Sequence, residues 1–403
     1  MTYQPDNIIL EKYAKVLVNF ALNSGRGVAP GEVIRLNVGL SALPMYRALV
    51  KVIIDSDAHV IGGVSDDMSG SGRYFYNNAT ARQLNFFPAK YGRGLTEQID
   101  HSIAILSEHD IHELDGVDPK KIMKTQKKAK PMREWLDKKE NAGKFTWTLA
   151  LYGTPAIAKE AGLSLEEYWA QIIHANYLDH KDPIAEWKKI NREIERVSSA
   201  LTNLQIEKLH VVGKDVDLSV KIGKDRKWLG GSGRNIPSFE VFTSPDWRGT
   251  EGWIRFDQPL YKYGQVVRGI ELKFEKGRVV KATAKQNKKI LQEILTSDKG
   301  ASQLGEFSLT DRRLSRITKF MADDLFDENM GGPFGNTHVA VGRSFFDTYT
   351  GSIAGKPNSF FSKLGFNQSV IHTDMISTTD RTVTATLPGG EQKVIYKKGQ
   401  FTI

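Results

Sequence analysis

The hydrophobic positions in the first half of the chain follow two alternating periods. Residues 7–22 have helical spacing, and a second helical stretch begins near Pro44. Between and after them, residues 33–38 and 59–64 form short apolar runs with strand character. Helices that alternate with buried strands are typical of a parallel sheet with crossover helices. We therefore expect an N-terminal α/β domain built on a mostly parallel sheet.

The same alternation continues up to a polar break. Residues 145–151 indicate another buried strand, and helical stretches follow at residues 155–161 and 164–178. The chain becomes polar at residues 178–183, and a charged helix at residues 184–204 is suited to joining two domains. A prior of about 150 residues per domain gives two to three domains for 403 residues. We place the boundary so that residues 1–185 form the N-terminal α/β domain and residues 186–403 form the C-terminal catalytic domain.

Beyond the charged helix the pattern changes to short β-branched segments bounded by turns. Such segments are typical of antiparallel strands. They lie at residues 209–212, 217–222, 252–256, 266–274 and 278–285. A helix is predicted over residues 288–296. The fold class is therefore α/β, with a sheet-rich α+β domain in the C-terminal half.

The composition then limits the kinds of metal site and nucleophile that the chain can contain. Hydrophobic residues make up 40% and charged residues 26% of the chain, as in globular proteins. The chain has no cysteine, which excludes disulfides, iron–sulfur clusters, thiolate zinc sites and cysteine nucleophiles. Any metal ion must be held by oxygen and nitrogen. The first apolar stretch, residues 16–22, follows Asp6 and Glu11 and is too short for a signal peptide or a membrane span, so we expect a cytoplasmic protein without a membrane partner.

The net charge of +9 is partly local. Six lysines fall within residues 120–130, at an expected helix start after Asp118 and Pro119. A run of this kind is usually a solvated helix face. We do not expect nucleic acid as a partner, because the sequence has no recognisable module that reads a groove or a single strand.

The strand-like run at residues 369–377 contains two polar residues that an apolar strand does not need. His372 and Asp374 are two residues apart, so they share one face of the strand. A carboxylate buried in such a strand costs several kcal/mol unless it is paired or bound to metal. Histidine with carboxylate is a ligand pair for zinc, cobalt or manganese. The alternative is a hydrogen-bonded His–Asp pair in the core.

Three more polar residues lie in apolar or glycine-rich surroundings. His338 precedes a short apolar run, and the carboxylates Glu240 and Glu306 are set among aromatic residues. Each alone is more often structural. With His372 and Asp374, however, they form a set of three carboxylates and two imidazoles, which suits two divalent ions that share a bridging carboxylate. Two divalent ions carry four positive charges, and the three carboxylates carry three negative charges. A bridging hydroxide would neutralise the remaining positive charge.

The segments that carry these residues resemble the thermophilic-type aminopeptidases, a family of dinuclear metallopeptidases in bacteria and archaea. The likeness rests on five segments in the family's order, and it is strongest over residues 228–377. The segments are residues 235–243 (NIPSFEVFT), 304–306 (LGE), 325–329 (LFDEN), 336–342 (NTHVAVG) and 371–374 (IHTD).

This resemblance implies a function and a set of site residues. The implied metal ligands are Glu240, Glu306, His338, His372 and Asp374. The implied activity is hydrolysis of the N-terminal peptide bond of a peptide with a free N-terminus. Two divalent ions, whether zinc, cobalt, manganese or magnesium, would bind the α-amine, polarise the scissile carbonyl and activate a water. The resemblance also implies a homodimer.

Two carboxylates are candidates for further roles in catalysis. Glu306 is our candidate for the bridging ligand, and it is also a candidate proton shuttle. Glu328, in the LFDEN segment, is a second candidate shuttle, with a solvated loop carboxylate as the alternative. Another two-metal hydrolase that acts on a phosphoester is the main rival, since the same ligands can clamp phosphoryl oxygens.

One position departs from the family pattern. Where the family has a tyrosine, seven residues after the first metal histidine, this chain has Phe345. Phenylalanine cannot donate a hydrogen bond. Either Tyr349 or another donor replaces the hydroxyl, or this chain is a family member of low activity or acts on something else.

Overall fold

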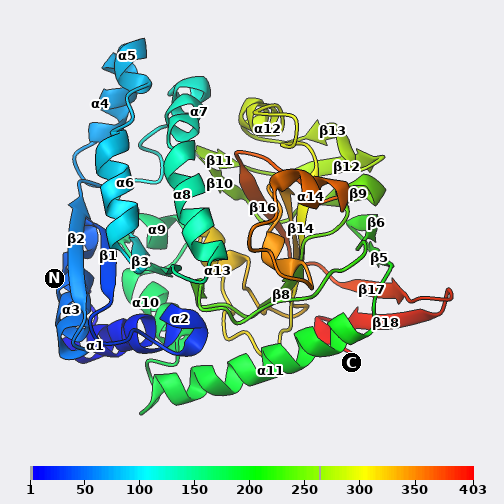
Figure 1. The fold of residues 1–403 in the computed structure, drawn as a ribbon, viewed down its shortest axis with the longest axis horizontal. Coiled ribbons are helices and arrows are strands. Elements are labelled where there is room, and N and C mark those ends of the chain that lie inside the picture. Colours follow the sequence, from blue (N-terminus) through cyan, green and yellow to red (C-terminus); the bar gives the residue numbers. More distant parts are fainter. Residues whose placement is uncertain (1–2, 263–264) are drawn as a thin grey trace.

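The computed structural model describes residues 3–262 and 265–403. The N-terminal segments, blue to cyan in Figure 1, lie on one side of the molecule. The strands of the second half lie in the middle and on the other side, and the hairpin of β17 (Arg381–Thr386) and β18 (Gln392–Lys397) extends to the lower right.

The N-terminal half is built on a parallel sheet of five strands, as the alternating pattern predicts. Its order is β2-β1-β3-β4-β7, and each neighbouring pair is parallel. β2 is the edge strand and is largely exposed. The strands are β1 (Val33–Gly39), β2 (His59–Ser65), β3 (His101–Leu106), β4 (Thr146–Leu151) and β7 (Asn235–Ile236).

Helices precede and connect these strands. The predicted helix at residues 7–22 is α1 (Asn7–Val16), continued by a π-helical turn at Leu17–Ala21; the backbone is extended at Leu22, and the short segment α2 (Leu22–Gly25) follows. The basic run starts α7, where the Asp118 carboxylate caps the helix by accepting a hydrogen bond from the Lys120 N–H. The others are α3 (Leu43–Asp55), α4 (Ser71–Asn78), α5 (Ala81–Leu84), α6 (Ala89–Gln98), α7 (Pro119–Lys128), α8 (Lys130–Asn141), α9 (Pro155–Glu160) and α10 (Leu165–Ala175).

The charged helix expected at residues 184–204 is α11 (Pro183–Asn203), which runs along the lower edge in Figure 1. Its start is fixed by Asp182, whose side chain accepts from the Ala185 N–H, and by Pro183 in the first turn. Trp187 is buried and stacks on Phe20 on one side and on Phe239 on the other. The apolar face of α11 therefore packs against both halves of the chain.

The second half contains an antiparallel sheet of eight strands, ordered β13-β12-β9-β6-β5-β17-β18-β19. One predicted strand was wrong: residues 266–274 form two strands, because Gly269 has a φ of +66° and turns the chain between them. The first, β11 (Gln265–Val267), pairs with β10 (Leu260–Lys262) instead. The remaining strands are β5 (Lys208–Gly213), β6 (Val216–Lys221), β9 (Glu251–Arg255), β12 (Glu271–Glu275), β13 (Arg278–Thr283) and β19 (Gln400–Phe401).

A second antiparallel sheet, ordered β16-β15-β14-β8, lies near the centre of the molecule (Figure 1). Every residue of its two middle strands is buried. Its strands are β8 (Glu240–Thr243), β14 (Leu304–Thr310), β15 (Asn336–Gly342) and β16 (His372–Ser377), and the nearby helices are α12 (Lys288–Leu295), α13 (Asp324–Asp327) and α14 (Asn358–Lys363).

The N-terminal core also takes in residues from the second half. Ile236, Phe239, Ile317 and Phe326 pack in the same buried cluster as the residues of β1 and α1. The division after residue 185 remains a prediction. Among the helices that the structure describes, none has the length and apolar character needed to cross a bilayer.

Candidate metal centre

The five predicted ligands lie on one face of the central four-stranded sheet. Residues directly opposite each other on neighbouring strands share a face. His338 lies opposite Ser308, two residues from Glu306, and Ala340 lies opposite both Glu306 and Asp374. His372 lies opposite Gly342, and Glu240 is opposite Thr310. Each of the four strands therefore contributes to one cluster of polar groups.

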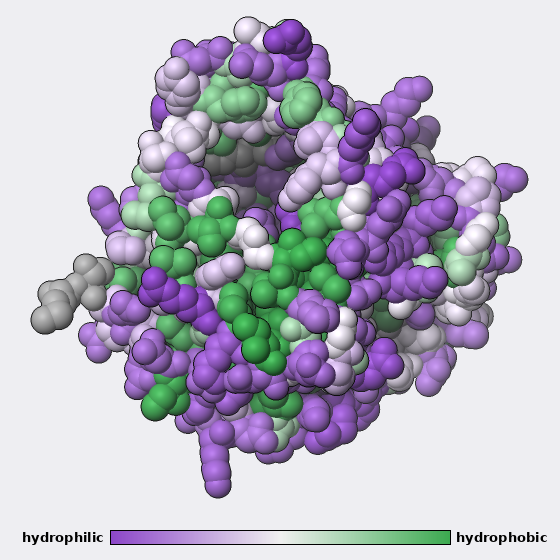
Figure 2. Space-filling view, turned by 60° about the vertical axis from the view of Figure 1, so that its left-hand side comes forward, coloured by the Kyte–Doolittle hydropathy of each residue, from purple (hydrophilic) through white to green (hydrophobic). Residues whose placement is uncertain are grey.

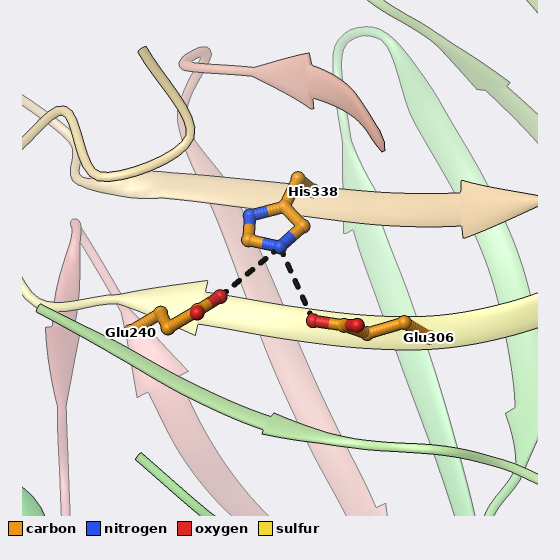
Figure 3. A group of neighbouring side chains, drawn as sticks. All are labelled: Glu240, Glu306 and His338. Carbon is orange, nitrogen blue, oxygen red and sulfur yellow. Dashed lines mark ion pairs between the residues drawn. The ribbon is translucent and has the colours of Figure 1, made fainter. Parts of the chain in front are cut away.

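Glu306 occupies the centre of this cluster. Its Oε1 lies 3.4 Å from His338 Nε2, and its Oε2 lies 3.3 Å from His372 Nε2. The third contact of this kind joins His338 Nε2 to Glu240 Oε2, at 3.2 Å (Figure 3). The two oxygens of one carboxylate thus face two different imidazoles, which is the arrangement expected of a bridging ligand.

Asp374 completes the cluster on β16. Its Oδ1 lies 3.3 Å from His372 Nε2 and 4.0 Å from His338 Nε2. Sequence spacing placed His372 and Asp374 on one face, and the structure agrees. The His–Asp contact of the alternative interpretation is present, but both residues also lie close to partners from other strands.

Glu328 lies beside this site and is not a solvated loop residue. It is buried, and one oxygen accepts from Asn235 Nδ2 at 2.8 Å. Glu328, His338 and Asp374 each offer one ligand atom within 4.8 Å of the others, as do Glu240, Glu306 and His338. A third such group is formed by Glu306, His372 and Asp374.

The imidazoles are held so that Nε2 faces the carboxylates. His372 Nδ1 lies 2.7 Å from the carbonyl oxygen of Arg343, to which its N–H can donate. Such a bond on the remote nitrogen orients a metal-binding histidine and leaves the near nitrogen free. His338 Nδ1 is buried without a partner among the described residues.

The carboxylates of the cluster raise the pKa values of its two histidines. Burial lowers the pKa of His338, but the carboxylates of Glu240 and Glu306 raise it well above its usual value. Burial likewise lowers the pKa of His372, and Asp374 and Glu306 together raise it to about 10. The extra protons on the two imidazoles stand in for cations, because several carboxylates cannot share one buried site without compensation.

The pKa values of the acidic residues in the cluster are shifted in opposite directions. Burial raises the pKa of Glu240, although His338 opposes this effect. Burial also raises the pKa of Glu328 well above its usual value, and the nearby Glu240 and Asp374 add to it. For Asp374, burial is outweighed by the charges of His372, His338 and Lys262, and the pKa falls well below its usual value. Acids of contrasting affinity for a proton are typical of a functional site.

The residues fit a pair of divalent ions. Two ligands of a tetrahedral ion with bonds of about 2.1 Å are separated by roughly 3.4 Å. The contacts of 3.2 to 3.4 Å between His338 and its two glutamates, and between His372, Glu306 and Asp374, match that separation. Imidazole with carboxylate suits transition-metal ions, and carboxylates alone suit harder cations.

The site opens onto a cavity of about 1700 Å³. His372 and Phe345 are both in its wall, and the rings of these two residues are in contact. Tyr349, the other aromatic candidate, packs instead against Phe360 and Phe361, with their ring centroids 5.5 and 6.0 Å away. A role for Tyr349 at the metal centre remains a prediction without a contact that supports it.

Two charged residues of the cavity wall, Arg234 and Lys262, lie outside the chemical motifs identified in the sequence. Arg234 forms ion pairs with Glu140 on α8 and with Asp347, and Lys262 at the end of β10 donates to the main-chain carbonyl of His372. All four of these charged residues line the cavity. Their partners lie far apart in sequence, so no local pattern could have indicated them.

Comparison with known proteins finds aminopeptidases among the relatives of this chain. Aminopeptidase T of Thermus thermophilus is 28% identical, with 98% of each chain covered, and aminopeptidase 2 of Geobacillus stearothermophilus is 27% identical, with 97% of each covered. The solved structure of wild-type AmpT from Thermus thermophilus has the same fold, with a TM-score of 0.83 at 24% identity, over 98% of this chain and 99% of that one. The sequence model of the thermophilic metalloprotease (M29) family matches residues 7–401. The chain therefore belongs to the thermophilic metalloprotease (M29) family, which confirms the expectation of a metal-dependent peptidase.

Proposed function

We propose that this chain is an aminopeptidase that removes the N-terminal residue of peptides, with two divalent cations held by the central sheet. The observation that carries the proposal is the position of Glu306, whose two oxygens face His338 and His372 separately. The names of the relatives, aminopeptidase T and aminopeptidase 2, support the same activity.

The proposed ligands divide between the two cations. Glu240, Glu306 and His338 would hold one ion, and Glu306, His372 and Asp374 would hold the other. Glu328 is close enough to His338 and Asp374 to act as a further ligand or as a proton carrier. Zinc, cobalt, manganese and magnesium are the candidate ions.

When bound, two such cations would polarise the scissile carbonyl and lower the pKa of a water molecule. The chain's own residues do the rest. The cavity brings the peptide to His372, which lies in its wall. Asn235 holds the Glu328 carboxyl in place, and burial gives this group a high proton affinity. Glu328 is therefore suited to take a proton from the attacking water and to pass it to the leaving amine.

The test of this function combines metal analysis with a panel of substrates. Purified protein is analysed for bound elements, stripped with a chelator, and assayed after each candidate metal is added back. We expect hydrolysis of aminoacyl p-nitroanilides and no hydrolysis of phosphoester substrates. Cleavage of the phosphoesters alone would refute the proposal. Very slow cleavage of every aminoacyl substrate would indicate that Phe345 makes this a member of low activity.

We also propose a homodimer in the cytoplasm. Several large apolar side chains are exposed on α4, α6 and the segment between them, including Tyr74, Phe86 and Tyr91 at 66 to 72% exposure. The adjacent edge strand β2 is exposed as well. Figure 2 shows a further apolar surface, where hydrophobic residues gather below a hollow. Analytical ultracentrifugation tests this proposal, and a monomer at all micromolar concentrations would contradict it.

A further inference from the structure

Lys262 is a cation beside the metal centre that the family motifs do not include. Its strand, β10, lies beside β16, which carries His372 and Asp374. The Lys262 ammonium donates to the main-chain carbonyl oxygen of His372, with Nζ and O 3.3 Å apart. The same side chain lines the cavity together with His372 and Phe345. Lys262 therefore projects toward the place where a substrate would meet the metals.

Two arginines near His372 are paired with carboxylates. Arg343 forms an ion pair with Asp137. Arg234 is fixed between Glu140 and Asp347. An ammonium has three donors, and one acceptor for Lys262 is found in the described part of the chain, the carbonyl of His372. As far as residues 3–262 and 265–403 show, two N–H groups of Lys262 are therefore left for a ligand in the cavity.

We propose that Lys262 donates a hydrogen bond to the oxyanion that develops on the scissile carbonyl oxygen, and so supplies the donor that Phe345 lacks. The inference rests on the proposed aminopeptidase function. The two positions flank the same histidine, since the Phe345 ring contacts the His372 imidazole and Lys262 contacts its carbonyl.

The chemistry of the step balances without any further reagent. The oxygen of water forms a bond to the carbonyl carbon, and the carbonyl π electrons move onto its oxygen. The ammonium of Lys262 stabilises that negative charge without transferring its proton. The electron pair then returns, the C–N bond breaks, and the leaving amine takes up the proton that the water lost. The products are a free amino acid and a shortened peptide.

The test compares Lys262→Met with Lys262→Gln and with the control Lys356→Met. Lys356 lines the same cavity, but its ammonium lies over the ring of Phe360, 4.1 Å from the centroid. We expect kcat on an aminoacyl p-nitroanilide to fall about 10²- to 10³-fold in Lys262→Met, as on loss of one oxyanion donor. Lys262→Gln, which retains an N–H donor, should lose less, and Lys356→Met should lose little. Bound metal should be unchanged in all three variants.

Ligand affinity separates stabilisation of an oxyanion from a merely structural role. An α-aminophosphonate resembles the tetrahedral anion, whereas the free amino acid is the product. In Lys262→Met, calorimetry should show the phosphonate affinity falling about as much as kcat, and the amino acid affinity changing far less. Equal losses for both ligands, or a loss of metal, would overturn the proposal.

The double variant Lys262→Met/Phe345→Tyr gives a second test. A tyrosine hydroxyl at position 345 should recover at least tenfold of the lost kcat, because it restores a donor near His372. Phe345→Tyr alone should change kcat by less than that, because the wild-type chain already has a donor. Full activity in Lys262→Met would refute the role of Lys262, whereas an inactive wild-type protein with every metal would refute the aminopeptidase function itself.

Discussion

The ring of Phe345 lies against the imidazole of His372, with the two centroids 4.8 Å apart and the planes inclined by 61°. On its other side, Phe345 contacts Phe242, with the centroids 5.7 Å apart. The position where the family pattern has a tyrosine is therefore packed as an apolar wall beside a proposed metal ligand. The wall holds the imidazole, but it offers no hydrogen bond to a substrate.

Tyr349 is a tyrosine close in sequence to Phe345. Its packing predicts that it does not replace the hydroxyl that Phe345 lacks. Its ring contacts Phe360 and Phe361 rather than His372. Tyr349→Phe should therefore leave both kcat and metal content unchanged, because only the hydroxyl is removed. Steady-state kinetics on one aminoacyl substrate measures this directly. A tenfold or greater loss of kcat with full metal content would mean that Tyr349 moves to the metals during catalysis.

Among the proposed ligands, Glu306 should be the one whose loss is most damaging, because its two oxygens face two imidazoles. Glu306→Gln keeps the size but removes the charge, so we expect at least one ion per chain to be lost. Activity should fall by about 10² or more, since the two-metal arrangement is broken. Glu271→Gln, which changes a partly exposed glutamate of β12 that pairs with Arg255, is the matched control. Elemental analysis that found full metal in Glu306→Gln would rule out the bridging role.

Removal of metal should destabilise the folded protein. Carboxylates gathered on one sheet face repel one another without cations, and a ligand present at 100 times its Kd adds about 2.7 kcal/mol to the free energy of unfolding. A chelator should therefore lower the Tm of the wild-type protein. It should have much less effect on Glu306→Gln, which already lacks part of the site. Equal Tm values for the loaded and stripped wild type would contradict a closely packed carboxylate cluster.

The sequence predicted most of the local elements and a set of candidate ligands that the structure brings together, but not the long-range contacts. Residues two apart share a face of a strand, so His372 and Asp374 could be paired from spacing alone. The convergence of Glu240, Glu306 and His338 depends on strand register, which sequence does not reveal without a resemblance to a family. The split at Gly269 was missed because the apolar pattern continues through the turn.

Arg234 and Lys262 show the limit of sequence patterns more clearly. Arg234 precedes the two-residue strand β7, which joins the parallel sheet beside β4 although it follows β4 by more than eighty residues. Its partner Glu140 lies on α8, and its other partner, Asp347, lies in the cavity wall after Phe345. Such contacts arise only from the tertiary fold, and no spacing rule links these three residues.

Arg234 should connect the N-terminal helices to the wall beside the metals. Its guanidinium lies 2.9 Å from Glu140 and 2.7 Å from Asp347, and the residue is largely buried. Arg234→Met would leave two partly buried carboxylates without a cation, which costs about 3 kcal/mol or more. We expect a lower midpoint in urea unfolding and a raised KM, with metal content intact. Arg255→Met, which removes an exposed arginine with two carboxylate partners, is the control. An equal loss of stability in both variants would argue against a special role for Arg234.

The last prediction concerns Asp323, the residue that caps α13. Its side chain accepts a hydrogen bond from the Phe326 N–H, at 3.3 Å. Burial and the charge of Asp324 together raise its pKa to about 7, against the opposing effect of the cap bond. An unfolded aspartate has a pKa of about 3.9. Between about pH 4 and pH 7 the folded state therefore holds a proton that the unfolded chain has released.

Because the folded state binds the extra proton, the free energy of unfolding should fall as the pH rises through this window and level off above pH 7. A shift of about three pKa units corresponds to roughly 4 kcal/mol, and the partial exposure of Asp323 reduces this to about 1 to 2 kcal/mol. Asp323→Asn keeps an oxygen for the cap but cannot ionise, so its stability should vary less with pH. The measurement is urea unfolding of the metal-loaded protein at pH 5, 6, 7 and 8. Asp118→Asn, at the exposed cap of α7, should keep the wild-type slope. If Asp323→Asn also kept that slope, the carboxyl of Asp323 would not be the source of the pH dependence.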